Sequence, residues 1–548
     1  MKRLFRKQFL AGIAAAAMAV LTLASCSNGP DLGAYIPGDA TGVMSVDLDK
    51  LWDKADLSNI EQLSFAKLGL QELRSEDPQV AAIIDGILKD PRSTGLDLKG
   101  DLVAYAIPDR ENGIRGGFLI TMHKRAKFEE FLEKMADVES SEVTFSDLNG
   151  FRVAKFSNYG PTVVFNNKLA MMFTDEMDYE SLLEMKHKES LGANKHFRNY
   201  WKNRSEISMW LSFDKVFKMA ELQGADIEEM MAETGMGQDY WDAVKESAMA
   251  ANLTFEKGVI RVKSEVQGVS NRFFDTYAQK FNDDIVKYLP EQTLACVTVG
   301  YNFNQMVSIL QKQKDSKSTI DEVVFADKTV GDVIKAFGGS FALSLSDIVK
   351  TEQGGLMPLL TLSADIKDAE TIRAALAEAG LEEANGIYTI PDEFGLGTEI
   401  YIAIGKKAAV VTNSKATAQQ FGEGGYKKAI NAVAKKAKEG NYVYANLDLG
   451  QYPAAVTELI PSNSGSLLLL LAQCLDRTEI YTTGKKSANW DIYIKDTKQN
   501  SLLAMMHFVD DHLVELGNLT GSMGGDDECP VYEEEYYVDE EGDWEYDD

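Results

Sequence analysis

The chain has 548 residues and a formal net charge of −29 at pH 7. So large a negative charge argues against nucleic acid and against anionic lipid surfaces as partners. Hydrophobic residues make up 45% and charged residues 26% of the chain, which excludes an intrinsically disordered protein, and the length allows more than one domain.

The first 25 residues have the layout of a secretory signal. Four basic residues, Lys2, Arg3, Arg6 and Lys7, precede an almost wholly apolar, alanine-rich stretch over residues 9–23, which is too short for a comfortable membrane span. The stretch ends in Leu23-Ala24-Ser25-Cys26, which resembles the bacterial lipobox, where a peptidase cleaves before a cysteine that carries diacylglycerol.

The sequence therefore predicts a signal peptide over residues 1–25, lipid attachment at Cys26 and a tether over residues 26–34. Several acyl chains on one cysteine would hold the protein firmly in a membrane, which places it in the bacterial cell envelope. We expect the outer membrane, on its periplasmic or its surface face. The alternative is ordinary secretion with an unmodified Cys26.

Two distant stretches of the body open in the same way. Residues 35–46 are Tyr-Ile-Pro-Gly-Asp-Ala-Thr-Gly-Val-Met-Ser-Val, and residues 288–299 are Tyr-Leu-Pro-Glu-Gln-Thr-Leu-Ala-Cys-Val-Thr-Val. The tyrosine, the aliphatic residue, the proline and the alternating strand that follows align without a gap. This similarity indicates an internal repeat.

The predicted elements after the two openings follow one order. Two strands and a helix are expected over residues 99–107, 118–122 and 128–135, and again over residues 338–345, 359–362 and 372–376. Asn149-Gly150 and Asn385-Gly386 then precede short strands. Residues 166–168 and 405–407 are expected to form hairpin turns with a positive backbone angle.

Each copy continues with a strand that passes into a helix, at residues 207–211 and 442–447. A closing hairpin follows, over residues 253–262 and 480–494, and then a long helix, over residues 273–285 and 503–513. Adjacent hairpins mixed with helices favour largely antiparallel sheets with helices packed on them, the α+β class. We predict two similar tandem units, residues 35–287 and 288–523, with chance similarity of apolar patterns as the alternative.

The last residues differ abruptly in composition. From residue 524 to 548 acidic residues alternate with aromatic ones, and no lysine or arginine occurs. Such a segment repels itself and lacks aliphatic residues for a core, so we predict a disordered tail. It is either a solvating terminus or an acidic, aromatic strip that engages a basic partner surface or loosely binds calcium.

The densest group of potential metal ligands is His507, Asp510, Asp511 and His512, in a helical stretch. The two histidines are five residues apart, so they do not share one helix face as a metal-binding pair at i and i+4 would. A polar helix edge explains these residues better than a metal site.

Other motifs also favour structural roles. Gly422-Glu423-Gly424-Gly425 follows a helix and is expected to be a connecting loop, and residues 483–487 are expected to be a hairpin turn. The tryptophans Trp52, Trp201, Trp210, Trp241 and Trp490 are expected in the core rather than in sugar-stacking platforms. His123, His187 and His196 have no nucleophile nearby in the sequence.

Apart from Cys26, the chain has Cys296, Cys474 and Cys529, without a metal-site or redox spacing. We expect Cys296 and Cys474 to be buried free thiols, although an oxidising envelope would permit a disulfide between them. The segment Leu467–Leu471 is expected to be part of a buried helix.

The lipobox, the following Tyr-Ile-Pro-Gly-Asp-Ala and residues 43–51 together resemble a family of large Bacteroidetes lipoproteins of unknown function, DUF4836. The resemblance implies a location and no mechanism, and it supplies no site residue beyond Cys26. We therefore predict no catalytic, metal-binding or cofactor-binding residue. The expected function is non-enzymatic binding or scaffolding of a protein or glycan, with an envelope hydrolase acting on glycan or peptide as the alternative.

Overall fold

The computed structural model describes residues 31–513, apart from residues 110–112, 139, 158–160, 174–178, 234–237, 313, 352–353, 393–397, 427–435, 437–440 and 458–464. Cys26, the predicted signal peptide, most of the tether and the acidic tail over residues 524–548 lie outside the described residues. The described part combines helices with antiparallel sheet, which confirms the α+β class.

Twenty strands in the described part form one continuous antiparallel sheet. From one edge to the centre the order is β4 (Val143–Leu148), β5 (Phe151–Phe156), β6 (Thr162–Phe165), β7 (Leu169–Phe173), β3 (Gly113–Thr121), β2 (Asp101–Asp109), β1 (Gly42–Asp47), β8 (Ile207–Ser212), β9 (Ala248–Glu256) and β10 (Val259–Gln267).

From the opposite edge to the centre the order is β16 (Glu383–Ala384), β17 (Ile387–Ile390), β18 (Ile400–Ile404), β19 (Ala408–Thr412), β15 (Leu356–Ile366), β14 (Phe337–Lys350), β11 (Ala295–Gly300), β20 (Tyr442–Asn446), β21 (Leu475–Gly484) and β22 (Ser487–Ile494). The two series meet where β10 pairs with β22, with Arg261 opposite Asp491 and Val262 opposite Trp490. A small separate hairpin joins β12 (Val323–Phe325) and β13 (Lys328–Thr329).

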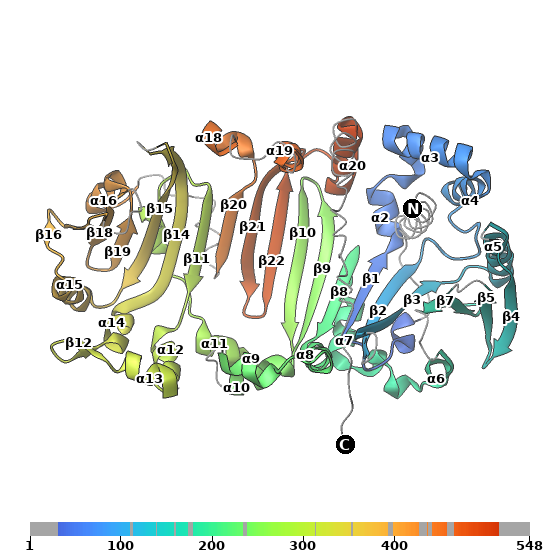
Figure 1. The fold of residues 1–548 in the computed structure, drawn as a ribbon, viewed down its shortest axis with the longest axis horizontal. Coiled ribbons are helices and arrows are strands. Elements are labelled where there is room, and N and C mark those ends of the chain that lie inside the picture. Colours follow the sequence, from blue (N-terminus) through green and yellow to red (C-terminus); the bar gives the residue numbers. More distant parts are fainter. Residues whose placement is uncertain are drawn as a thin grey trace, which may run out of the picture.

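Most helices lie beyond the ends of the strands, above and below the sheet in Figure 1, so the central strands have no helix drawn across them. The helices are α2 (Leu48–Lys54), α3 (Ser64–Glu76), α4 (Pro78–Lys89), α5 (Arg125–Val138), α6 (Tyr179–Glu184), α7 (Lys195–Lys202), α8 (Phe213–Leu222), α9 (Ile227–Glu233), α10 (Gln238–Lys245), α11 (Asn271–Tyr277), α12 (Phe303–Leu310), α13 (Lys314–Ile320), α14 (Val330–Ala336), α15 (Ala369–Glu378), α16 (Lys415–Gly422), α18 (Ala454–Thr457), α19 (Gly465–Cys474) and α20 (Ser501–Asp511).

Short 3-10 helices add η1 (Leu32–Tyr35), η2 (Leu57–Gln62), η3 (His187–Glu189), η4 (Leu191–Ala193), η5 (Asp283–Tyr288) and η6 (Leu449–Gln451). Within the described part of the chain, none of the helices combines the length and the apolar character that crossing a bilayer requires.

Alternation along the strands gives the sheet two different faces. Val43, Val103 and Trp210 lie on one face, which we call the core face, and they belong to the largest buried cluster. Cys296, Ala342 and Tyr442 lie on the same face in a second cluster at the other end of the sheet. Met44 and Met209, the neighbours of Val43 and Trp210, are paired on the opposite face, which we call the strip face.

The two Asn-Gly pairs form tight hairpin turns within the sets of short strands, between β4 and β5 and between β16 and β17. Asn149 and Gly150 have φ values of 50° and 82°, and Asn385 and Gly386 have φ values of 52° and 80°. Asparagine and glycine suit two consecutive left-handed residues, which the β4–β5 and β16–β17 hairpins require.

The prediction of positive backbone angles at residues 166–168 and 405–407 is wrong. Both segments connect strands as hairpins, but none of their residues is among those with a positive φ. In the first turn Asn166 Oδ1 accepts hydrogen bonds from the backbone N–H groups of Lys168 and Leu169 instead. The side chain closes the turn there without a left-handed residue.

The long helix predicted over residues 273–285 is broken in the structure. It consists of α11 and η5, separated by an extended segment in which Ala278 forms a bridge to Tyr301. Asn282 Oδ1 then accepts the N–H of Asp284 and begins η5. The long helix predicted at the corresponding place in the second copy, α20, is continuous. Of the two strands predicted to pass into a helix, β8 leads into α8, whereas β20 leads only into the three-residue η6.

Candidate functional site

A row of exposed apolar side chains crosses the strip face. The strand pairings place Phe118, Met44 and Met209 in one part of the row and Trp490, Ile480, Val297 and Leu343 in the other, with Leu360 beside them. These eight side chains, which we call the apolar strip, are each between 38% and 47% exposed. Between the two parts lie the small residues Ala251, Ser264 and Ala488.

The apolar strip corrects the prediction that every tryptophan belongs to the core. Trp52 and Trp210 are buried and Trp201 and Trp241 are partly buried, but Trp490 is 45% exposed. Its register on β22 turns it to the strip face, where its indole N–H donates to Thr478 Oγ1 at 2.7 Å. A contiguous apolar patch on a folded protein is a common sign of a binding surface.

The opposite side of the same central strands carries an ion-pair cluster, formed by Arg261, Asp491, Glu479, Arg477 and Lys436. Arg261 of β10 binds Asp491 of β22 with two parallel hydrogen bonds, Nε to Oδ1 at 2.7 Å and Nη2 to Oδ2 at 3.0 Å. The Asp491 side chain is fully buried. This bidentate pair joins the two series of strands where they meet.

The remaining members of the ion-pair cluster surround Glu479, whose side chain is 5% exposed. Arg477 Nε donates to Glu479 Oε1 at 2.8 Å, and Lys436 Nζ forms an ion pair with the other carboxylate oxygen. Lys436 Nζ also lies 4.2 Å from the ring centre of Tyr481, and Tyr493 accepts a hydrogen bond from Lys436 at 3.1 Å.

The surroundings of Asp491 determine its protonation state. Burial alone would raise the pKa of this carboxyl group, but hydrogen bonds from Arg261 and Tyr481 and the charges of Arg261 and Lys436 outweigh burial and hold the pKa below its ordinary value. The carboxylate is therefore ionised and fully engaged at neutral pH. Such a carboxylate is suited to holding two strands together and is poorly suited to proton transfer.

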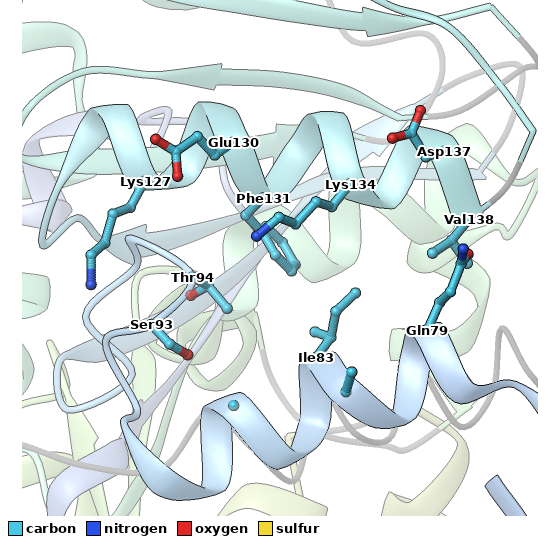
Figure 2. Close-up of a pocket in the computed structure, with 12 residues that line it drawn as sticks. Gln79, Ile83, Ser93, Thr94, Lys127, Glu130, Phe131, Lys134, Asp137 and Val138 are labelled. Atoms are coloured by element: carbon cyan, nitrogen blue, oxygen red, sulfur yellow. The ribbon is translucent and has the colours of Figure 1, made fainter. Parts of the chain in front are cut away.

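A shallow groove lies between α4 and α5, with a volume of about 430 Å³ (Figure 2). Ile83 and Phe131 lie between the two helices, whereas Lys127, Glu130, Lys134 and Asp137 all come from α5. The basic and acidic side chains that line the groove therefore all belong to α5. The arrangement holds no pair of converging carboxylates of the kind that glycoside hydrolysis needs.

His507, Asp510 and Asp511 lie on α20 as the sequence predicted, and His512 directly follows the helix. Asp510 and His512 have separate partners. Asp510 Oδ1 accepts the backbone N–H of Phe65 at 2.9 Å, which attaches α20 to α3. His512 stacks on Phe508 with ring centres 4.3 Å apart. Among the described residues no three histidine, cysteine, aspartate or glutamate side chains are placed to hold a metal ion.

The other predicted motifs have the expected local structure. Gly422 ends α16, and residues 423–425 form the loop that follows, in which Gly424 and Gly425 have positive φ values. The hairpin turn between β21 and β22 lies at residues 485–486. His123, His187 and His196 lie in the first series of elements, away from the ion-pair cluster in sequence and fold. Leu470 and Ala472 are buried in α19, as predicted for this leucine-rich segment.

Cys296 and Cys474 are free thiols in the structure. Cys296 is buried on β11, and burial raises the pKa of its thiol to about 12. Cys474 ends α19 and is half-buried, and burial raises the pKa of its thiol as well. Both thiols are therefore protonated and weakly reactive at neutral pH.

The fold defines an antiparallel α+β protein whose central strands are apolar on one face and charged on the other. A family model described as a domain of unknown function, DUF4836, matches residues 33–502, and the chain therefore belongs to this family. This confirms the family predicted from the opening motif, while the Bacteroidetes origin stays a prediction.

No curated protein sequence matches the chain. Among solved structures, one entitled "Structure of crystal form I of TP0453" is similar over 46% of this chain and 90% of that chain, with 8% identical residues and a TM-score of 0.24. A likeness this low is no guide to function.

Sequence reasoning missed both features of the central strands. Alternation places Arg261 and Asp491 on the opposite face from their apolar neighbours Val262 and Trp490, but it does not show which of the two faces is buried. The pairing of β10 with β22 could not be found in this way, since nothing in either strand specifies its partner across more than 200 residues.

Proposed function

We propose that this protein is a lipid-anchored, non-catalytic protein of the bacterial cell envelope that binds a partner protein through the apolar strip. The lipobox-like Leu23-Ala24-Ser25-Cys26 supports the anchor, and Cys26 would carry the lipid. The outer membrane is the location that we propose.

The apolar strip is the observation that carries the binding role. Eight large apolar side chains, each 38–47% exposed, lie on one face of the sheet. Monomeric proteins rarely expose apolar patches larger than about 300–600 Å², and those that do commonly use them as interfaces. A sheet face without charged side chains in its row matches a protein surface that is itself apolar.

We also propose that the body consists of two similar units, residues 35–287 and 288–523, which form the strip jointly. The order of strands is the same from each edge of the sheet to the centre, and β10 and β22, which hold the same place in the two series, pair with each other. The strip includes Phe118, Met44 and Met209 from the first series and Leu343, Val297 and Trp490 from the second.

The competing function is an envelope hydrolase that acts on glycan or peptide. It would need a carboxyl group that is free to exchange protons or to attack a substrate. In the described residues the buried carboxylates Asp491 and Glu479 are bound by Arg261, Arg477 and Lys436, so they favour the binding role.

The test is photo-crosslinking in intact cell envelopes. A photoreactive amino acid replaces Met209 or Leu343 in the strip, one in each proposed unit, and in matched controls it replaces Leu222 on α8 or Val509 on α20, which are each 38% exposed. We expect one and the same protein adduct from both strip positions and none from the controls. Adding Ile480→Lys, which places a charge in the strip, should abolish the adduct.

Adducts of equal yield from the control positions, or no adduct from the strip, would contradict the binding role. An adduct of carbohydrate mass would make the partner a glycan. The anchor is tested separately by mass spectrometry of the mature N-terminal peptide, which should begin at Cys26 and carry acyl chains.

A further inference from the structure

A basic surface stands out on this acidic protein. Five side chains, Lys186, Lys188, Lys195, Arg198 and Lys202, are exposed on and around η3 and α7. Between residues 185 and 204 the sequence contains one acidic residue, Glu189, and its carboxylate accepts the backbone N–H of Lys186 at 3.0 Å. We call these five side chains the basic surface.

The basic surface is not neutralised by the neighbouring protein. Among the described residues none of its five cations forms an ion pair, whereas the nearby Arg204 binds Asp101 at 3.0 Å. On its other side α7 is held firmly, because Phe197 and Tyr200 are fully buried in the first core cluster. The surface therefore presents free cations from a rigid support.

The start of the described chain packs directly against this support. Leu191 donates its backbone N–H to the Ile36 carbonyl at 2.8 Å, and Gly38 donates to the Glu189 carbonyl at 3.0 Å. Gly33 is so close to α7 that a Cβ on it would lie 3.1 Å from the Phe197 ring. The tether thus leaves the body beside the basic surface.

The short tether limits the distance to the membrane. Only five residues of chain lead from Cys26 to Asp31, and a fully extended chain spans at most about 3.5 Å per residue, so they cover no more than roughly 18 Å. A lipid on Cys26 would therefore hold η1 and α7 close to the headgroups. Electrostatic attraction acts over about 8 Å at physiological ionic strength. When the tether is less than fully extended, the distance between the basic surface and the headgroups falls within this range.

We propose that the basic surface docks on the anionic phospholipid headgroups of the membrane that holds the anchor. The inference rests on the lipid anchor proposed above. The net charge of −29 argues against an anionic membrane for the chain as a whole, but these five cations are a local exception at the point of attachment. The membrane would attract the basic surface and repel the acidic rest of the protein, so the body would take one orientation relative to the membrane.

The experiment uses the full-length lipidated protein in vesicles. One preparation contains phosphatidylcholine with phosphatidylglycerol, and the other contains phosphatidylcholine alone. Acetylation of Lys186, Lys188, Lys195 and Lys202 is followed by mass spectrometry, with the exposed hairpin residues Lys406 and Lys407 as internal controls. We expect acetylation of the basic surface to fall by about five-fold or more in the anionic vesicles only, and to recover in high salt.

Charge reversal gives the matched comparison. The triple variant Lys195→Glu, Arg198→Glu and Lys202→Glu should remove the protection of Lys186 and Lys188. A control triple variant, Lys67→Glu, Lys406→Glu and Lys407→Glu, changes the net charge equally on other exposed positions and should leave the protection intact. Circular dichroism of both variants checks that each is folded.

The possible failures are distinguishable. A protein that does not float with either kind of vesicle lacks the anchor, which contradicts the proposed location itself. A protein that floats but shows equal acetylation in both kinds of vesicle contradicts the docking alone. Protection that is already present in detergent micelles would mean that something else covers the surface, such as the acidic segment Asp526–Asp548 of the same chain, and would also overturn the inference.

Discussion

The two faces of the central strands are built from adjacent residues and have opposite properties. On the core face Arg261 forms a bidentate ion pair with the fully buried Asp491. On the strip face the next residues, Val262 and Trp490, are paired, and Trp490 is 45% exposed. Charge is buried where apolar side chains would be expected, and apolar surface is exposed where charge would be expected.

This inversion indicates that the two faces have different tasks. A buried ion pair is weak evidence for stability, because desolvation offsets much of its attraction, but it specifies which strand pairs with which. An exposed apolar row adds little to folding and is useful only when something covers it. The core face thus holds the ion pair at the junction of the two strand series, and the strip face is the one that we propose for a partner.

Replacing one tryptophan on each face should give the largest contrast. Trp210→Ala empties a buried position of the first core cluster, so we expect the free energy of unfolding to fall by about 4 kcal/mol. Trp490→Ala removes a side chain that is already 45% exposed, so we expect a loss of about 1 kcal/mol. Urea unfolding followed by circular dichroism measures both, and equal losses would contradict the contrast between the faces.

Breaking the junction should be the next largest effect. Asp491→Ala leaves the Arg261 guanidinium without its buried partner, and we expect a loss of about 3 kcal/mol in the free energy of unfolding. Asp476→Ala, the matched control on β21, removes a carboxylate that is 43% exposed in its pair with Arg477 and should cost less than about 1 kcal/mol. A small effect of Asp491→Ala would mean that the β10–β22 junction does not depend on this pair.

The sequence predicted much of the sheet because its information is local. Alternating strands and the closing hairpins over residues 253–262 and 480–494 depend on neighbouring residues, and the structure contains both hairpins. The prediction of one helix over residues 273–285 was wrong. The apolar spacing there fits a helix, but the bridge between Ala278 and Tyr301 holds the chain extended and interrupts it.

The apolar strip and the ion-pair cluster were harder to predict because they depend on residues that are distant in the sequence. Trp490 was expected in the core on the strength of its residue type, yet its exposure depends on which face β22 turns outward. Likewise, the carboxylates Asp491 and Glu479 gave no motif, since their partners Arg261 and Lys436 come from distant parts of the chain. Only tertiary pairing brings these groups together.

Lowering the pH should have opposite effects through two buried carboxyl groups. Asp491 has a folded-state pKa below 3.8, so its stabilising contribution is present above the unfolded-state value and is lost as the pH falls through the lower folded-state pKa. For Asp101, burial outweighs the charge and hydrogen bond of Arg204 and raises the pKa above 3.8. Protonation of Asp101 therefore begins at a higher pH in the folded state and adds stability.

Two asparagine variants measure these contributions. The difference in unfolding free energy between the native protein and Asp491→Asn should decrease as the pH falls below about 4, and the difference for Asp101→Asn should change in the opposite direction from a higher pH. Urea titrations at several pH values between about 3 and 6 give both curves. Curves with the same slope would contradict the assignment of these two environments.

Thiol labelling compares the two faces of the sheet at two neighbouring residues and should disturb the fold least. Cys296 is 1% exposed on the core face, where burial raises the pKa of its thiol to about 12, while Val297 is 38% exposed on the strip face. In a Val297→Cys variant the new thiol should react with a maleimide much faster than Cys296, which should react only when the protein is unfolded in urea. Mass spectrometry of the labelled peptide separates the two sites. If a partner covers the strip in isolated envelopes, Val297→Cys should be protected there and reactive after purification, which would link the apolar face to its proposed use.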